Sequence, residues 1–243
     1  GLGIPAEPLF RSSVLVNIRT MLKAIIYKEW LKTRGVFLIG LLLSVCMAGF
    51  EILSMNRVGT VKGVEHIWQI MLMKDNMFVN HLTFIPLAVG VGVGLAQMLP
   101  EMVQKRFKLT LHLPYSQNRM VLAMLAVGLA EIVAVSVVTS VIVVVYDIRI
   151  LAPELVSRVV LTMSPWFVAG VVAYFFTAAV CIEGCRVQKV ALSLLGVGVV
   201  SWLFAGDAPE AYNGVLLLFV VASLSCALLV YRSVYRFKEG LQD

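Results

Sequence analysis

Residues 120–146 read MVLAMLAVGLAEIVAVSVVTSVIVVVY, an apolar run in which Glu131 is the one charged residue. A helix needs about 20 apolar residues to cross a hydrocarbon core of about 30 Å. Because lipid cannot satisfy backbone amides, such a run predicts a transmembrane helix. This run is longer than a bilayer requires, so we expect the helix to tilt or to protrude.

The rest of the chain has the same character. Of its 243 residues, 60% are hydrophobic and 14% are charged, whereas a soluble domain is roughly half apolar and about a quarter charged. Six apolar runs predict six transmembrane helices, at 35–53, 82–99, 120–146, 159–181, 187–205 and 214–231. The fifth run is the weakest and is also compatible with a re-entrant segment. We therefore expect an all-α integral membrane protein embedded in a lipid bilayer.

The distribution of cations predicts the orientation of these helices. If both termini are cytoplasmic, 15 of the 20 Lys and Arg residues fall in cytoplasmic segments and 5 fall in outer loops. Cytoplasmic loops carry such an excess of Lys and Arg. We predict a multi-pass protein of a prokaryotic cell membrane with both termini inside. The Lys and Arg residues that keep these segments in the cytoplasm account for the net charge of +6. We therefore expect no nucleic acid partner.

The segments around the spans have distinct expected roles. Residues 1–20 lack periodicity and predict a flexible leader or upstream extension, followed by a helix at 21–34 and a six-span domain at 35–243. An inner loop is expected at 100–119 and an outer loop at 54–80. Apolar residues at 64, 67, 68 and 71 predict a short surface helix within the outer loop.

The helix predicted at 21–34 has the features of an interfacial elbow. Its apolar residues, including Trp30, recur every four positions, and lysines such as Lys28 lie beside them. One stripe of such a helix lies among acyl chains while its lysines meet anionic headgroups. Glu29 falls on the apolar side, so we expect it to bond to protein. Gly35 permits a bend into the first span.

Glu131 is the acidic residue set deepest in a predicted span. A charge at bilayer depth costs about 2.5–3.5 kcal/mol, so this side chain faces protein or water, or is protonated. It either contacts a substrate or a second copy, or bonds to a neighbouring helix for structure alone. We expect no second carboxylate or histidine at the same depth, and no catalytic role.

Residues 90–94 read GVGVG and superficially resemble a phosphate-binding loop. No Lys-Ser or Lys-Thr follows and no strand precedes, so the context of such a loop is missing. Gly90 and Gly94 instead predict a small-residue face that another helix approaches closely. Pro86 and Pro165 fall inside predicted spans two and four, where proline kinks a helix.

No enzyme-like constellation occurs in the sequence. The four cysteines and three histidines do not have the spacing of a structural zinc site. We expect free thiols, no metal and no cofactor in this chain, and no catalytic residues.

The loop at 100–119 is a short polar segment between the second and third predicted spans. After Pro100, residues 101–108 predict about two helical turns, and Pro114 ends whatever precedes it. The apolar residues Leu109, Leu111 and Leu113 have no reason to lie in a solvated loop. They indicate contact with the membrane surface or with a partner.

Two segments carry a resemblance to a known family. YKEWLKTRG at 27–35 resembles the elbow of permease subunits of type-2 ABC exporters. EMVQKRFKLTLHLPYSQNRMVLAML at 101–125 is similar to the loop between spans two and three in that family. The family often has Gly-Thr where this chain has Lys105 and Arg106, so no substrate is carried over.

The resemblance implies the permease of an ATP-driven exporter that pairs with itself or with a related permease. ATP and Mg²⁺ would be bound by separate ABC-type ATPase subunits, and the segment 101–113 would be the coupling helix that contacts them. The residues that the resemblance assigns to coupling are Glu101, Gln104, Lys105, Arg106, Phe107 and Lys108, and those of the elbow are Lys28, Glu29 and Trp30. The alternatives are a membrane scaffold or assembly subunit without an ATPase partner, and an intramembrane enzyme or ion-coupled carrier.

Overall fold

The computed structural model describes residues 7–73, 75, 77–104, 116–206 and 208–239, with side chains from residue 20 onward except at residue 64. Within these ranges the chain is helical and contains no strand. The α-helices are α1 (Glu7–Lys62), α2 (Val64–Met73), α3 (Ile85–Val103), α5 (Gln117–Asp147), α6 (Pro153–Ile182), α7 (Arg186–Leu203), α8 (Leu216–Ser225) and α9 (Ala227–Glu239). Two 3₁₀ turns, η1 (Asn80–Leu82) and η2 (Asn213–Val215), precede α3 and α8.

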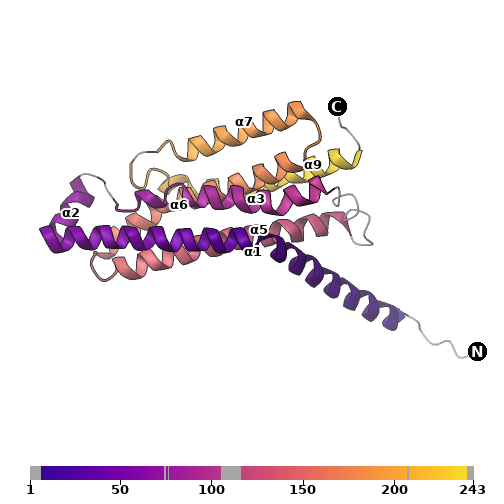
Figure 1. Cartoon of the computed structure of the whole chain (residues 1–243), viewed down its shortest axis with the longest axis horizontal. Helices are drawn as coiled ribbons and strands as arrows, with labels where there is room; N and C mark the ends of the chain where they lie inside the picture. Colours follow the sequence, from indigo (N-terminus) through magenta and orange to yellow (C-terminus); the bar gives the residue numbers. More distant parts are fainter. Residues whose placement is uncertain (1–6, 74, 76, 105–115, 207, 240–243) are drawn as a thin grey trace, which may run out of the picture.

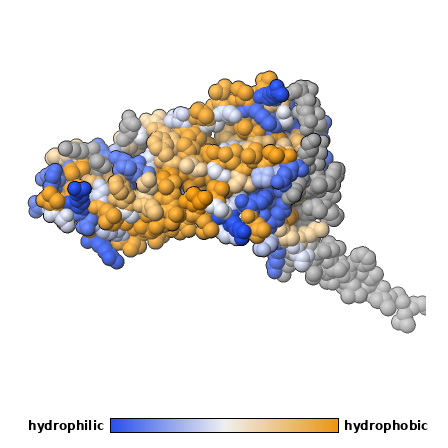
Figure 2. Space-filling view, viewed as in Figure 1, coloured by the Kyte–Doolittle hydropathy of each residue, from blue (hydrophilic) through white to orange (hydrophobic). Residues whose placement is uncertain are grey.

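In the part of the chain that the structure describes, six helical segments are long and apolar enough to cross a membrane. They are Thr20–Lys62, Asn80–Val103, Gln117–Asp147, Pro153–Ile182, Arg186–Leu203 and Asn213–Glu239. Each corresponds to one predicted run, which confirms the six candidate spans. Hydrophobic residues cover most of the middle of the bundle, and hydrophilic residues gather toward its ends (Figure 2). By the length and composition of its helices, the chain is a multi-pass membrane protein.

The most extensive contact between two helices of the bundle is that of α3 with α6 (Figure 1). A Cβ at Gly90 would lie 2.0 Å from the carbonyl oxygen of Gly170, so no side chain fits between the two backbones. A Cβ at Gly94 would lie 3.0 Å from Cβ of Thr177 on the same face of α6. Small residues allow helices in a membrane to pack closely, and the structure places both glycines of the predicted face against α6.

The helix α1 contains both the predicted elbow and the first span. It is continuous from Glu7 to Lys62, so Gly35 lies within an unbroken helix. Figure 1 shows that the N-terminal part of α1 leaves the bundle at an angle, while the remainder packs along α3 and α5. The charged residues at 28–34 are therefore carried directly alongside the bundle.

The helix predicted in the outer loop is present as α2, and α1 also extends into that loop as far as Lys62. The chain reverses at Gly63, whose φ of +84° lies in a region that favours glycine. The reversal brings α2 back against α1 and buries Ile67 and Met71, which lie one turn apart. The apolar spacing thus predicted the helix, whereas its packing against α1 through Ile67 and Met71 is a feature of the tertiary structure.

Two local features differ from the predicted spans. Pro86 does not kink a helix, because it stands in the first turn of α3, where the missing amide hydrogen costs nothing. Pro165 does lie inside α6. The last span is interrupted at Cys226, between α8 and α9. There the hydroxyls of Ser223 and Ser225 donate to the carbonyls of Val220 and Val221, and such side-chain bonds compete with the helical ladder.

Candidate functional site

One face of α1 carries polar side chains into the bundle. Glu29 and Thr33 are completely buried, and Lys32 lies between them with its side chain 17% exposed. Positions three and four apart share a helix face, so all three point toward α3 and α5. The Nζ atom of Lys32 lies 2.7 Å from Oε2 of Glu29.

The last turns of α3 supply the second part of the site. Oε1 of Glu101 lies 2.7 Å from Nζ of Lys28 and 3.0 Å from Nζ of Lys32. Lys32 also approaches the carbonyl oxygen of Gln97 at 3.3 Å. Lys32 is thus shared between an acidic residue of its own helix and one of α3. Charge-assisted hydrogen bonds of this length are the stronger ones in proteins, so they fasten the end of α3 to α1.

The third part of the site is Glu131 of α5. The hydroxyl of Thr33 donates to Oε1 of Glu131, while Oε2 is buried and has no hydrogen-bond partner among the described residues. Glu29 also acts electrostatically on this carboxyl. The expectation that no second carboxylate lies at this depth is therefore wrong. The reason is that α1 packs against α5 where Thr33, one turn after Glu29, donates to Glu131.

The position of Glu131 also explains the excess length of α5. Glu131 meets α1 at Thr33, within the charged stretch 28–34, although α5 begins at Gln117. At 1.5 Å per residue, about 21 Å of helix precedes Glu131. The extra turns of α5 therefore lie on the side of the segment 105–115.

Gln97 of α3 and Tyr174 of α6, which no sequence pattern singled out, supply the fourth part of the site. Nε2 of Gln97 donates to the carbonyl of Met124 in α5 at 2.6 Å, and the hydroxyl of Tyr174 donates to Oε1 of Gln97 at 2.7 Å. A Cβ at Gly128 would lie 2.4 Å from the Tyr174 hydroxyl, so glycine is required there. The available signal was a glutamine in an apolar run, one turn before Glu101.

We name this group the polar cluster. Its members are Lys28, Glu29, Lys32, Thr33, Gln97, Glu101, Glu131 and Tyr174. It joins α1, α3, α5 and α6 with three carboxyl groups and two lysines. With this arrangement the polar cluster can hold the four helices together at one level of the bundle.

Tyr174→Phe tests the part of the polar cluster that Gln97 organises. Removal of the hydroxyl leaves Oε1 of Gln97 without this donor in a buried site, and an unsatisfied buried group costs about 1–3 kcal/mol. We expect the free energy of unfolding to fall by that amount, measured by denaturant titration in detergent. Tyr235→Phe, at an exposed position of α9, is the matched control and should have no effect. Equal stability of the two variants would contradict the described hydrogen bond.

The other predicted site residues have different positions. Trp30 is 39% exposed, and its ring centroid lies 5.4 Å from that of Phe37 on the same helix. Gln104 is exposed at the end of α3. The predicted coupling residues Lys105, Arg106, Phe107 and Lys108 lie outside the described residues.

Two more polar contacts hold the ends of the bundle. At the end that carries the polar cluster, Glu183 follows α6 and accepts from Arg236 Nε and from the Ser233 hydroxyl, each at 3.3 Å. At the opposite end, Arg158 of α6 lies 3.4 Å from Asp75 and 3.3 Å from Glu210.

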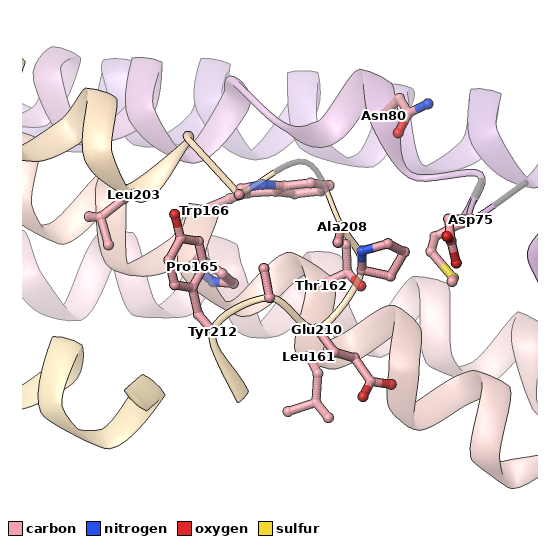
Figure 3. A pocket seen from close by; sticks show the side chains of 14 residues that line it. Asp75, Asn80, Leu161, Thr162, Pro165, Trp166, Leu203, Ala208, Glu210 and Tyr212 are labelled. Atoms are coloured by element: carbon pink, nitrogen blue, oxygen red, sulfur yellow. The ribbon is translucent and has the colours of Figure 1, made fainter. Parts of the chain in front are cut away.

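A small pocket of about 90 Å³ lies beside this opposite-end contact (Figure 3). Thr162 and Pro165 of α6 line it together with Glu210 and Tyr212 from the loop after α7. Among the described residues, no group of three or more His, Cys, Asp or Glu side chains could hold a metal ion.

Comparison of the chain with protein-family models, curated proteins and solved structures finds no match. The functional assignment therefore depends on the resemblance of the two sequence segments and on the geometry of the polar cluster.

Proposed function

We propose that this chain is the permease subunit of an ATP-driven exporter of the type-2 ABC kind. In this proposal it pairs with a second copy or a related permease, and separate ATPase subunits bind ATP and Mg²⁺. The cation distribution supports a prokaryotic cell membrane with both termini in the cytoplasm. The observation that supports the proposal is the bonding of the last turns of α3 to α1 through Glu101, because the proposed coupling segment 101–113 begins within these turns.

The polar cluster supports this role by its mechanical consequences. A displacement applied beyond Gln104 would act first on the last turn of α3. From there the pairs of Glu101 with Lys28 and Lys32 would transmit it to α1. The hydrogen bond from Gln97 to Met124 would transmit it to α5. Three helices would then move together, as a coupling device requires.

The assignment of nucleotide binding to a partner also has support in the packing of α3. Gly90 and Gly94 are accounted for by the close approach of α6, and a side chain at Gly90 would collide with backbone. Glycines committed to helix packing do not provide the open backbone cradle that phosphates need.

Reversal of two charges tests the proposed coupling. We expect Lys105→Glu with Arg106→Glu to lower permease-dependent ATP hydrolysis about tenfold or more, because unfavourable charge juxtaposition at an interface costs several kcal/mol. The measurement is the rate of ATP hydrolysis by the ATPase that co-purifies with the wild-type or the variant permease, after reconstitution of the pair in vesicles. The chain itself should still insert normally in the membrane.

Lys62→Glu is the matched control, because Lys62 is exposed at the other end of α1. It should leave hydrolysis unchanged. Unchanged hydrolysis in the double variant would contradict the coupling assignment. Failure of the wild-type chain to retain any ATPase would favour the scaffold alternative.

A further inference from the structure

The helix α7 lies along the edge of the bundle (Figure 1). It packs against α6, where a Cβ at Gly196 would lie 2.9 Å from the Phe176 ring. Large apolar side chains cover the rest of its surface, including Leu194 and Val197, which are 68% and 64% exposed. One side of α7 therefore meets the bundle, and the others are free to meet lipid.

A groove of about 630 Å³ lies between α7, α6 and α3. Its volume is in the range of about 300–1,000 Å³ that ligand sites occupy. The apolar side chains that form most of its walls include Leu87, Val91 and Leu95 of α3, Phe176 of α6, and Val197 and Val200 of α7. Such a surface binds hydrocarbon.

The two ends of this groove differ. At one end the rings of Phe84 and Phe204 approach with centroids 5.4 Å apart, which joins the start of α3 to the end of α7. At the other end Cys181 of α6 and Ser193 of α7 line the groove, and Lys189 lies one turn before Ser193 on the same face of α7. The groove therefore has aromatic rings at one end and, at the other, a cation one helical turn beyond its lining.

The cationic end has no acidic partner of its own. Within the described part of the chain, no ion pair involves Lys189 or its exposed neighbour Arg186. The nearby Glu183 already accepts from Arg236. Among the described residues, Arg186 and Lys189 are thus two cations without an ion-pair partner, in the turns of α7 that precede the groove-lining Ser193. They are complementary to an amphiphile with an anionic headgroup.

We propose that this groove binds an acyl chain of an anionic phospholipid of the bilayer, with its phosphate at Lys189 and Arg186. The stretch of α7 from Lys189 to Phe204 is about 22 Å long at 1.5 Å per residue, so an extended chain fits along it. Lipid tails are as apolar as the groove, so burial of the chain gives no preference among lipids. The preference comes from the headgroup, and each cation contributes about fivefold. This site does not depend on the proposed transport function.

The test uses the purified full chain in phosphatidylcholine vesicles that contain a trace of phospholipid spin-labelled on the acyl chain. Electron paramagnetic resonance measures the motionally restricted fraction, with phosphatidylglycerol or phosphatidylcholine as the labelled lipid. Because the contributions of the two cations multiply, we expect phosphatidylglycerol to be preferred about 25-fold. Lys189→Gln should lower this preference about fivefold, and Lys189→Arg should retain it. Arg34→Gln removes an exposed cation of α1 as a control and should leave the preference unchanged.

A second variant tests the groove itself. Val197→Trp fills the groove and should reduce the restricted fraction of both lipids, whereas Leu194→Trp, on α7 but outside the groove lining, should not. Equal binding of the two lipids by the wild-type chain would overturn the proposal, as would equal effects of the two tryptophan variants. A change of oligomeric state in Val197→Trp with unchanged bound lipid would assign the groove to a second copy and also overturn it.

Discussion

Lys32→Met is expected to lower the free energy of unfolding by about 3–5 kcal/mol, because removal of one partner from a buried ion pair leaves the other charge uncompensated. In this chain Lys32 is paired with both Glu29 and Glu101, and Glu29 is completely buried. The loss should appear as a shift of the unfolding transition in a denaturant titration in detergent. It should also loosen the hold of α1 on the end of α3.

A control and a second substitution make this prediction specific. Lys23→Met removes a lysine from an exposed position of the same helix and should change the free energy of unfolding little. Adding Glu29→Gln to Lys32→Met should recover part of the loss, since it removes one uncompensated charge. If Lys32→Met and Lys23→Met unfold at the same denaturant concentration, the polar cluster does not have the energetic role described here.

Gly90→Ala is expected to lower the free energy of unfolding by about 3 kcal/mol or more, at or above the upper end of usual overpacking costs. The new Cβ would lie 2.0 Å from the carbonyl oxygen of Gly170. Because that atom belongs to the backbone, α3 and α6 would have to separate along their contact. Thermal unfolding in detergent should show a large decrease in the midpoint temperature.

Gly198→Ala is the matched control for this substitution. Gly198 also lies inside a helix, but a Cβ there would meet nothing within 4 Å. Alanine favours helix over glycine by up to about 1 kcal/mol, so this variant should be as stable as the wild-type chain or slightly more stable. A Gly90→Ala variant as stable as Gly198→Ala would contradict the close approach of the two helices.

The spans were predictable because the thickness of the bilayer sets the length of the apolar runs in the sequence. A run such as 120–146 must be helical wherever it lies in the bundle, and α2 was predictable because Ile67 and Met71 recur at a helical spacing. The break at Cys226 was not predictable from hydropathy, because the apolar run continues through it. The hydroxyl-to-carbonyl bonds of Ser223 and Ser225 do not account for it alone, since Ser136 and Ser140 make bonds of the same kind inside the unbroken helix α5.

The polar cluster was only partly predictable. The sequence marked Glu29 and Glu131 as unusual, each for a separate reason, and the family resemblance assigned Glu101 to coupling. It contained no sign that they meet, because Thr33 and Glu131 are 98 residues apart and join only when α1 packs against α5. Tyr174 reads as an ordinary residue of an apolar span until its hydroxyl is seen to donate to Gln97. Contacts of this kind depend on tertiary packing, which local patterns do not encode.

In the proposed function, an ATPase subunit contacts the segment that continues from α3. A photo-crosslinking amino acid at position 107, in place of Phe107, tests this contact in native membranes, with mass spectrometry of the adducts as the readout. We expect an adduct with an ATPase that carries nucleotide-binding motifs, and its loss in the Lys105→Glu, Arg106→Glu background. Adducts with lipid alone would contradict the proposed contact.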